Sequence, residues 1–225
     1  MHDWEPDESE AGADPELESG APAYDLGFGV ADALAEANAR ADADAFNLRM
    51  AEHVAGRRYV KVGRDLDGES DVHGFLLAAS PGWLLLHEVS DFHLNGFVAL
   101  ARSEVCDVRH GKFEQAFGHM LAAEGVVAAA GLSARYAGLR IGDSESLFTG
   151  LMEAGRPVIV EGERSGDDMF LIGEVRRVGR RSLSVLHFDA NGRYDRLPTL
   201  CDYGRVTRVT FESEYIRVFS KYTKD

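Results

Sequence analysis

The chain has 225 residues, of which 45% are hydrophobic and 9% aromatic, and its formal net charge is −14 at pH 7. This length allows one large or two small domains with a buried core, and the sequence has no run of about 18 apolar residues that would span a membrane. Two cysteines without a CxxC pair argue against a disulfide framework or a cysteine zinc site, and an acidic start without a signal sequence favours a cytoplasmic location.

The negative charge is concentrated at the N-terminus. Residues 1–44 contain 13 acidic residues and one basic residue, a charge of −12, whereas the other 181 residues contain 25 acidic and 23 basic residues, a charge of −2. The first 28 residues are rich in acidic residues, proline and glycine, and such segments bury too little apolar surface to fold. We therefore predict a disordered acidic tail over 1–28, attached to a nearly neutral body.

A repeat follows this tail. One set of glycine and arginine positions recurs at an offset of 99 residues: Gly56-Arg57, Gly63 and Gly74 recur as Gly155-Arg156, Gly162 and Gly173. Two further sets match at offsets of 100 and 101: Leu86-His87 with Leu186-His187, and Val105 and Val108 with Val206 and Val209. Self-similarity at a fixed period indicates a duplicated structural unit.

Each unit is predicted to begin with a helix that ends at the repeated glycine, in the left-handed position that glycine favours. The first helix ends near Ala55 and buries Phe46, Met50, His53 and Val54; the second covers 144–154. Short β-branched or aromatic runs separated by turn residues then predict five strands in each unit. They are 57–62, 75–79, 83–89, 97–100 and 103–108 in the first unit, and 156–161, 174–178, 182–188, 197–200 and 205–211 in the second.

Many short strands with regular turns favour small barrels over a parallel sheet. The predicted fold is mainly β with helices: two small five-stranded barrels in tandem, each preceded by a helix, after the disordered tail. The predicted domains are 29–113 for the first helix and barrel, 114–143 for a helical linker and 144–225 for the second helix and barrel.

This pattern resembles the Sm-like fold, a strongly bent SH3-like barrel found in LSm proteins and Hfq-type RNA chaperones. The resemblance covers about 48–109 and 147–217, and it rests on the helix, the following Gly-Arg and valine-rich strand, and the glycine that heads the second strand. It implies RNA as a partner and self-association through barrel edge strands. The family's Asp-x-x-Met-Asn motif is absent from both units, and the closing run 205–222 is similar to the ends of uncharacterised bacterial proteins.

The candidate binding surface is an arginine-rich window. Between positions 176 and 208 eight arginines face only three acidic residues, a local charge of +5. The planar guanidinium group suits phosphate and carboxylate, and aromatic rings between basic groups are typical of single-strand binders. The candidate ligand-binding residues are Arg176, Arg177, Arg180, Arg181, Arg193, Arg196, Arg205, Tyr194 and Tyr203.

No pattern for catalysis is present. The sequence contains no HExxH, P-loop or Gly-x-Ser-x-Gly motif, so we predict no catalytic residues, no metal and no cofactor. His87 and His187, at matching repeat positions, are interpreted as structural residues. Two hypotheses follow: a non-enzymatic binding or assembly module that presents the arginines to RNA or to an acidic protein, and an acidic inhibitor or immunity-type protein that captures a basic protein through its tail.

Overall fold

The computed structural model describes residues 27–66, 71–164, 166 and 169–224. The chain divides into two compact units, Met1–Asp42 and Ala43–Asp225, and all strands among the described residues belong to the second unit. The acidic tail predicted over 1–28 falls, except for its last two residues, outside the described residues. The same is true of most of the segment on which the inhibitor hypothesis rests.

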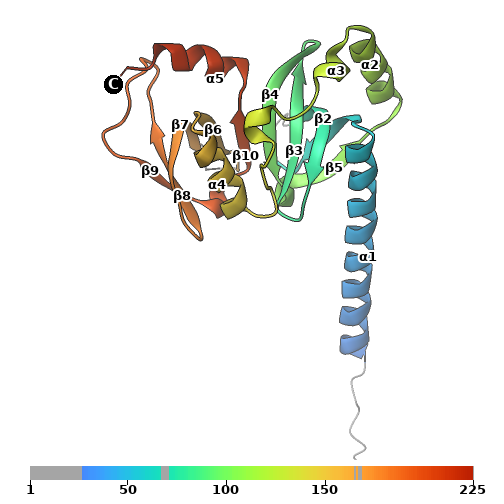
Figure 1. Ribbon diagram of the computed structural model, residues 1–225. Helices are drawn as coiled ribbons and strands as arrows, with labels where there is room; N and C mark the ends of the chain where they lie inside the picture. Colours follow the sequence, from blue (N-terminus) through green and yellow to red (C-terminus); the bar gives the residue numbers. More distant parts are fainter. Residues whose placement is uncertain (1–26, 67–70, 165, 167–168, 225) are drawn as a thin grey trace, which may run out of the picture. The chain divides into compact units, whose positions relative to one another are not determined.

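The first half of the chain folds as a helix followed by five strands (Figure 1). Its elements are α1 (Gly27–Ala55), β1 (Tyr59–Arg64), β2 (Val72–Ala79), β3 (Trp83–Ser90), β4 (His93–Ala101), the 3-10 helix η1 (Arg102–Glu104) and β5 (Val105–Arg109). The helix end near Ala55 is therefore confirmed, although the left-handed residue after it is Arg57, with φ 45°, rather than Gly56.

The second half repeats this series after a helical connection. The connection comprises α2 (Lys112–Ala123), α3 (Val126–Ala129) and η2 (Ala134–Tyr136). The second half comprises α4 (Ser144–Ala154), β6 (Val158–Gly162), β7 (Met169–Val178), β8 (Ser182–His187), β9 (Thr199–Asp202), η3 (Tyr203–Arg205), β10 (Arg208–Phe211), α5 (Glu214–Phe219) and η4 (Ser220–Tyr222). The bounds of α4 are as predicted, with Asp143 capping Ser146 N and Gly155 left-handed at φ 63°.

All ten described strands form one antiparallel sheet in the order β5-β1-β2-β3-β4-β10-β6-β7-β8-β9. The sheet is not closed, because β5 and β9 are its outer strands. The mainly β class with helices is confirmed, but the strands do not divide into two separate sheets, because β4 pairs with β10 along 97–100 and 208–211. The two halves have the same strand order when the first is read from β5 to β4 and the second from β10 to β9.

Glycine fixes the same close approach in both halves. A Cβ on Gly74 would lie 2.3 Å from the carbonyl oxygen of His87, and one on Gly173 would lie 2.0 Å from that of Leu186. A bulge follows in each half, between Leu76 and Ala78 and between Val175 and Arg177. The duplication indicated by these glycines therefore extends to local backbone geometry.

The strand register corrects one part of the repeat. Gly74 pairs with Glu88, and Gly173 pairs with His187, so the offset of 99 continues through the third strand. The counterpart of His87 is Leu186, and the match of His87 with His187 is wrong. The match of Val108 with Val209 is also wrong, because Lys61 pairs with Arg109 and its counterpart Val160 pairs with Val209.

Four apolar clusters among the described residues hold the sheet and helices together. The largest draws buried side chains from both halves, including Trp83 and Phe97 from the first and Phe148, Val209 and Phe211 from the second. Three smaller clusters lie under the C-terminal part of α1, under α2 and α3, and under α5. The core thus joins the two predicted domains within the unit Ala43–Asp225.

Candidate anion-binding surface

The structure divides the arginine-rich window into two groups at opposite ends of β8. One group lies on the hairpin that joins β7 to β8, and the other lies in the loop between β8 and β9. The hairpin carries Arg176, Arg177, Arg180 and Arg181, and the loop carries Arg193 and Arg196; all six are exposed. A linear window therefore predicted the exposed arginines but not their separation.

The bulge in β7 accounts for the exposure of consecutive arginines. Val175 is buried and pairs with Val185, whereas Arg177 pairs with Ser184 after the register shift. A bulge interrupts the alternation of side chains along a strand, so Arg176 and Arg177 are both exposed. The hairpin is closed by a hydrogen bond of 2.8 Å from Gly179 N to the carbonyl of Ser182.

Most of the hairpin arginines are available to a ligand. Arg176 forms an ion pair of 2.8 Å with Glu174 on its own strand. Within the part of the chain that the structure describes, no hydrogen bond or ion pair engages the side chains of Arg177, Arg180 and Arg181. Three adjacent guanidinium groups at one hairpin form a positively charged tip, which we call the arginine tip (Arg177, Arg180 and Arg181).

The two candidate tyrosines make contacts within the chain. Tyr203 donates a hydrogen bond of 2.6 Å to the carbonyl of Gly179, and its ring stacks on Phe148 at 5.6 Å. Tyr194 donates to Glu174 over 3.2 Å, and its ring meets Phe188 edge-on. Both side chains are half-buried, so neither is an open stacking platform for a base.

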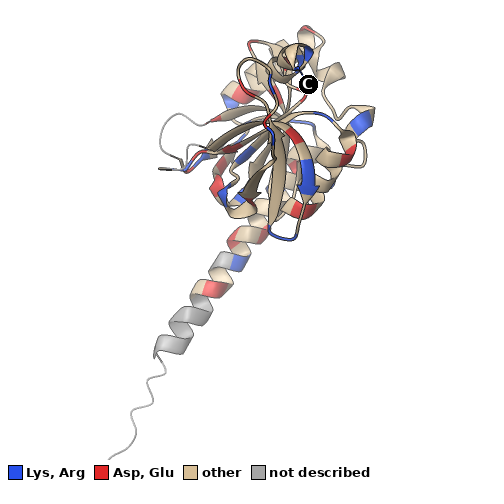
Figure 2. Cartoon of the chain, turned by 90° about the vertical axis from the view of Figure 1, so that its left-hand side faces the viewer, with Lys and Arg blue, Asp and Glu red and all other residues tan. Residues whose placement is uncertain are grey.

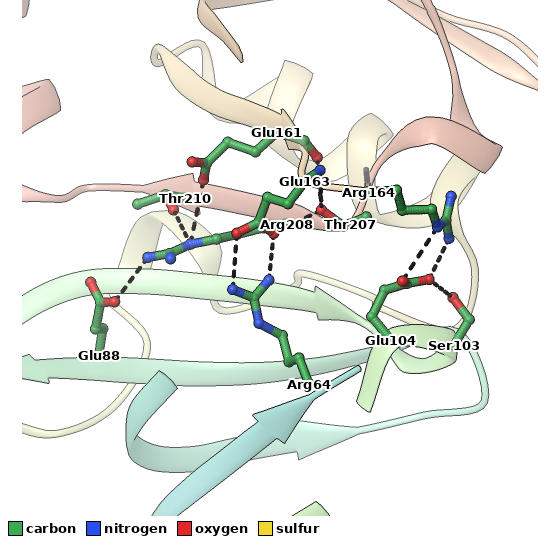
Figure 3. A network of polar contacts seen from close by, with 10 residues as sticks. All are labelled: Arg64, Glu88, Ser103, Glu104, Glu161, Glu163, Arg164, Thr207, Arg208 and Thr210. Carbon is green, nitrogen blue, oxygen red and sulfur yellow. Dashed lines mark hydrogen bonds and ion pairs between the residues drawn. The ribbon is translucent and has the colours of Figure 1, made fainter. Parts of the chain in front are cut away.

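The last two arginines of the window differ from the others. Arg205 is exposed in η3 and already engages a partner. Arg208 is half-buried on β10, where Nη2 lies 2.9 Å from Glu88 and Nε lies 3.4 Å from Glu161. Arg208 therefore belongs to the junction between the two halves rather than to a binding surface (Figure 3).

Three ion-paired groups of the described ranges cross this junction, as Figure 3 shows. Besides Arg208, they include Arg64 with Glu163, whose Nη2–Oε1 distance is 2.9 Å, and Arg164 with Glu104. Burial raises the pKa of the Glu163 carboxyl, but hydrogen bonds from Arg64 and Thr207 outweigh it, and the net pKa is lowered. The network is a structural joint along the β4–β10 contact.

A second basic cluster was not predicted from the sequence. Arg135, Arg156, Arg217 and Lys221 line a cavity of about 500 Å³ beside α5. Arg156 also lines a smaller hollow of about 230 Å³ with Arg176, so it lies between this cavity and the base of the β7–β8 hairpin. Three of these cations are far apart in the sequence, and the repeat drew attention to Arg156 alone, through the Gly155-Arg156 motif. Figure 2 shows that basic and acidic residues are interspersed over the sheet and loops.

The two histidines singled out in the sequence each contact the backbone of another segment. Gly131 N donates a hydrogen bond of 3.1 Å to His87 Nδ1, and burial lowers the pKa of His87 to about 4. His187 Nδ1 lies 2.9 Å from the carbonyl oxygen of Ile172 on the neighbouring strand. Among the described residues, no group of three or more His, Cys, Asp or Glu side chains is arranged to hold a metal ion.

Within the described ranges, no helix has both the length and the hydropathy needed to cross a bilayer. Comparison of the chain with protein-family models, with curated proteins and with solved structures finds no match.

Proposed function

We propose that the chain is a non-enzymatic module that binds single-stranded RNA through the arginine tip of its β7–β8 hairpin. The exposure of Arg177, Arg180 and Arg181, without an acidic partner in the described part of the chain, carries this proposal. Arginine presents a planar set of donors that matches phosphate oxygens. The same chemistry suits an acidic protein, which the experiment below separates from RNA.

Contact with RNA would be made to its phosphates rather than its bases. Tyr194 and Tyr203 are held by internal hydrogen bonds and ring contacts, so we do not include stacking of bases on these two rings in the proposal. Binding through phosphates is independent of base sequence and weakens steeply with salt, because it releases counterions. Arg193 and Arg196, at the far end of β8, are the second group of exposed cations along the same half of the sheet.

We further infer that the two halves are tandem copies of one small Sm-like barrel unit. The repeated strand order, the glycine contacts and the matching bulges support this inference. The β4–β10 pairing joins the outer strand of one unit to that of the next. The free outer strands β5 and β9 are candidates for the same pairing between copies of the chain.

The experiment is a titration of labelled single-stranded RNA of uniform sequence, followed by fluorescence anisotropy at several salt concentrations. The test variant carries Arg177→Gln, Arg180→Gln and Arg181→Gln. The control removes three exposed positive charges elsewhere in the same compact unit, at Arg49, Lys112 and Arg140. The proposal expects the test variant to bind at least about tenfold more weakly, and the control within about twofold of the wild type, since each charge-assisted contact is worth about tenfold.

Absence of RNA binding by the wild type would contradict the proposal. Equal weakening by the two variants would also contradict it, because the charge alone and not its position would then matter. Binding of polyglutamate but not of RNA, with the same loss in the test variant, would assign the arginine tip to an acidic protein instead.

A further inference from the structure

The cavity beside α5 is built from segments that are far apart in the sequence. Arg135 belongs to η2, Arg156 and Pro157 precede β6, and Glu212 to Lys221 surround α5. Its volume of about 500 Å³ lies within the range of roughly 300–1,000 Å³ that is usual for small-molecule sites. All of these residues belong to the compact unit Ala43–Asp225, so the cavity is formed within a single body.

The charge of the cavity wall is strongly positive. Four cationic side chains and one carboxylate, Glu212, line it, a net charge of +3 in a chain whose total is −14. Two of the cations have internal contacts that leave them able to bind a ligand. Arg135 uses one donor on the carbonyl of Ala154 at 3.1 Å, and Arg217 forms an exposed ion pair with Glu214, of a kind that contributes little stability.

We propose that this cavity binds the phosphate groups of a small phosphorylated molecule. A single carboxylate would offset one of the three net positive charges, whereas two phosphate groups, each carrying roughly −1.5 to −2 at neutral pH, offset all of them. Guanidinium groups bind phosphate oxygens in pairs, and Ile216 and Pro157 supply an apolar wall for the rest of the ligand. The site is separate from the arginine tip and does not depend on the RNA proposal.

Isothermal titration of the full chain with inorganic pyrophosphate at constant ionic strength tests the site. The test variant is Arg135→Gln with Arg156→Gln, and the control is Arg49→Gln with Arg140→Gln, which removes the same charge at exposed positions outside both the cavity and the arginine tip. We expect saturable binding by the wild type, a loss of at least about tenfold in the test variant and a change of less than about twofold in the control. A far-UV spectrum like that of the wild type shows that each variant is folded.

Absence of saturable binding by the wild type, or equal weakening by the two arginine variants, would overturn the proposal. Absence of RNA binding by the wild type, with its pyrophosphate binding intact, would reject the RNA proposal alone.

Discussion

Replacement of Glu163 by glutamine tests the joint between the two halves of the sheet. The side chain of Arg64 is 1% exposed and that of Glu163 is 26% exposed, and their atoms form two hydrogen bonds. Glu163→Gln keeps the shape of the side chain but removes the negative charge that accepts these two hydrogen bonds from a buried guanidinium. Loss of one partner of a buried pair costs about 3–5 kcal/mol, and the partial exposure of Glu163 places the expected cost near 3 kcal/mol.

The assay is urea denaturation followed by circular dichroism, with thermal unfolding as a second measure. A cost of about 3 kcal/mol lowers the melting temperature by about 6–12 °C for a chain of this size. Glu214→Gln is the matched control, because it removes the carboxylate of the exposed pair with Arg217, and it is expected to change stability by less than about 0.5 kcal/mol. A cost for Glu163→Gln no larger than that of the control would refute the reasoning.

The pH dependence provides an independent check on the same residue. The pKa of Glu163 is lowered in the folded chain because hydrogen bonds from Arg64 and Thr207 outweigh the effect of burial. Such a carboxyl stabilises the fold above its unfolded pKa, and this contribution is lost as the pH falls through the folded pKa. Glu163→Gln should therefore reduce the acid sensitivity of the free energy of unfolding, whereas an unchanged acid limb would contradict the assignment.

Further predictions concern backbone contacts and His87. Gly173→Ala should cost about 1–3 kcal/mol or more in urea denaturation, since its Cβ would lie 2.0 Å from the carbonyl of Leu186. Gly138→Ala, which meets no atom within 4 Å, should stay within about 0.5 kcal/mol of the wild type, and equal costs would contradict the close approach. His87, with a folded pKa of about 4 against 6.5 unfolded, binds its proton first in the unfolded state, so stability falls as the pH is lowered through this range. His87→Gln should remove up to about 3 kcal/mol of that loss, and an unchanged pH profile would show that His87 is not its source.

Local patterns in the sequence predicted most of the elements. The helix over 144–154 followed from a cap, an apolar face and a glycine stop, all of which act within a few residues. The repeated glycines at 74 and 173 marked positions where another strand's carbonyl leaves no space for a side chain. The third-strand match of Leu86-His87 with Leu186-His187 failed because it rested on two shared residue types, whereas the register of the strands follows the spacing from the repeated glycine.

Contacts between distant segments could not be predicted in the same way. The pairing of β4 with β10 depends on which strand edges remain free after each half has folded, and no local pattern encodes it. The arginine window was defined by counting charges along the chain. In the structure β8 runs between the hairpin arginines and the loop arginines, so the two groups lie at its opposite ends. The cavity beside α5 combines Arg135 with Arg217, which are 82 positions apart in the sequence, so no local charge cluster marked it.

The salt dependence of RNA binding tests the central claim most directly. Each phosphate contact to a single strand contributes about −0.7 to the slope of log K against log salt concentration, so loss of three arginine contacts should flatten the slope by about 2. We predict this change for the variant with Arg177→Gln, Arg180→Gln and Arg181→Gln, relative to the wild type. Equal slopes for the two proteins would show that the arginine tip does not contact RNA and would contradict the account.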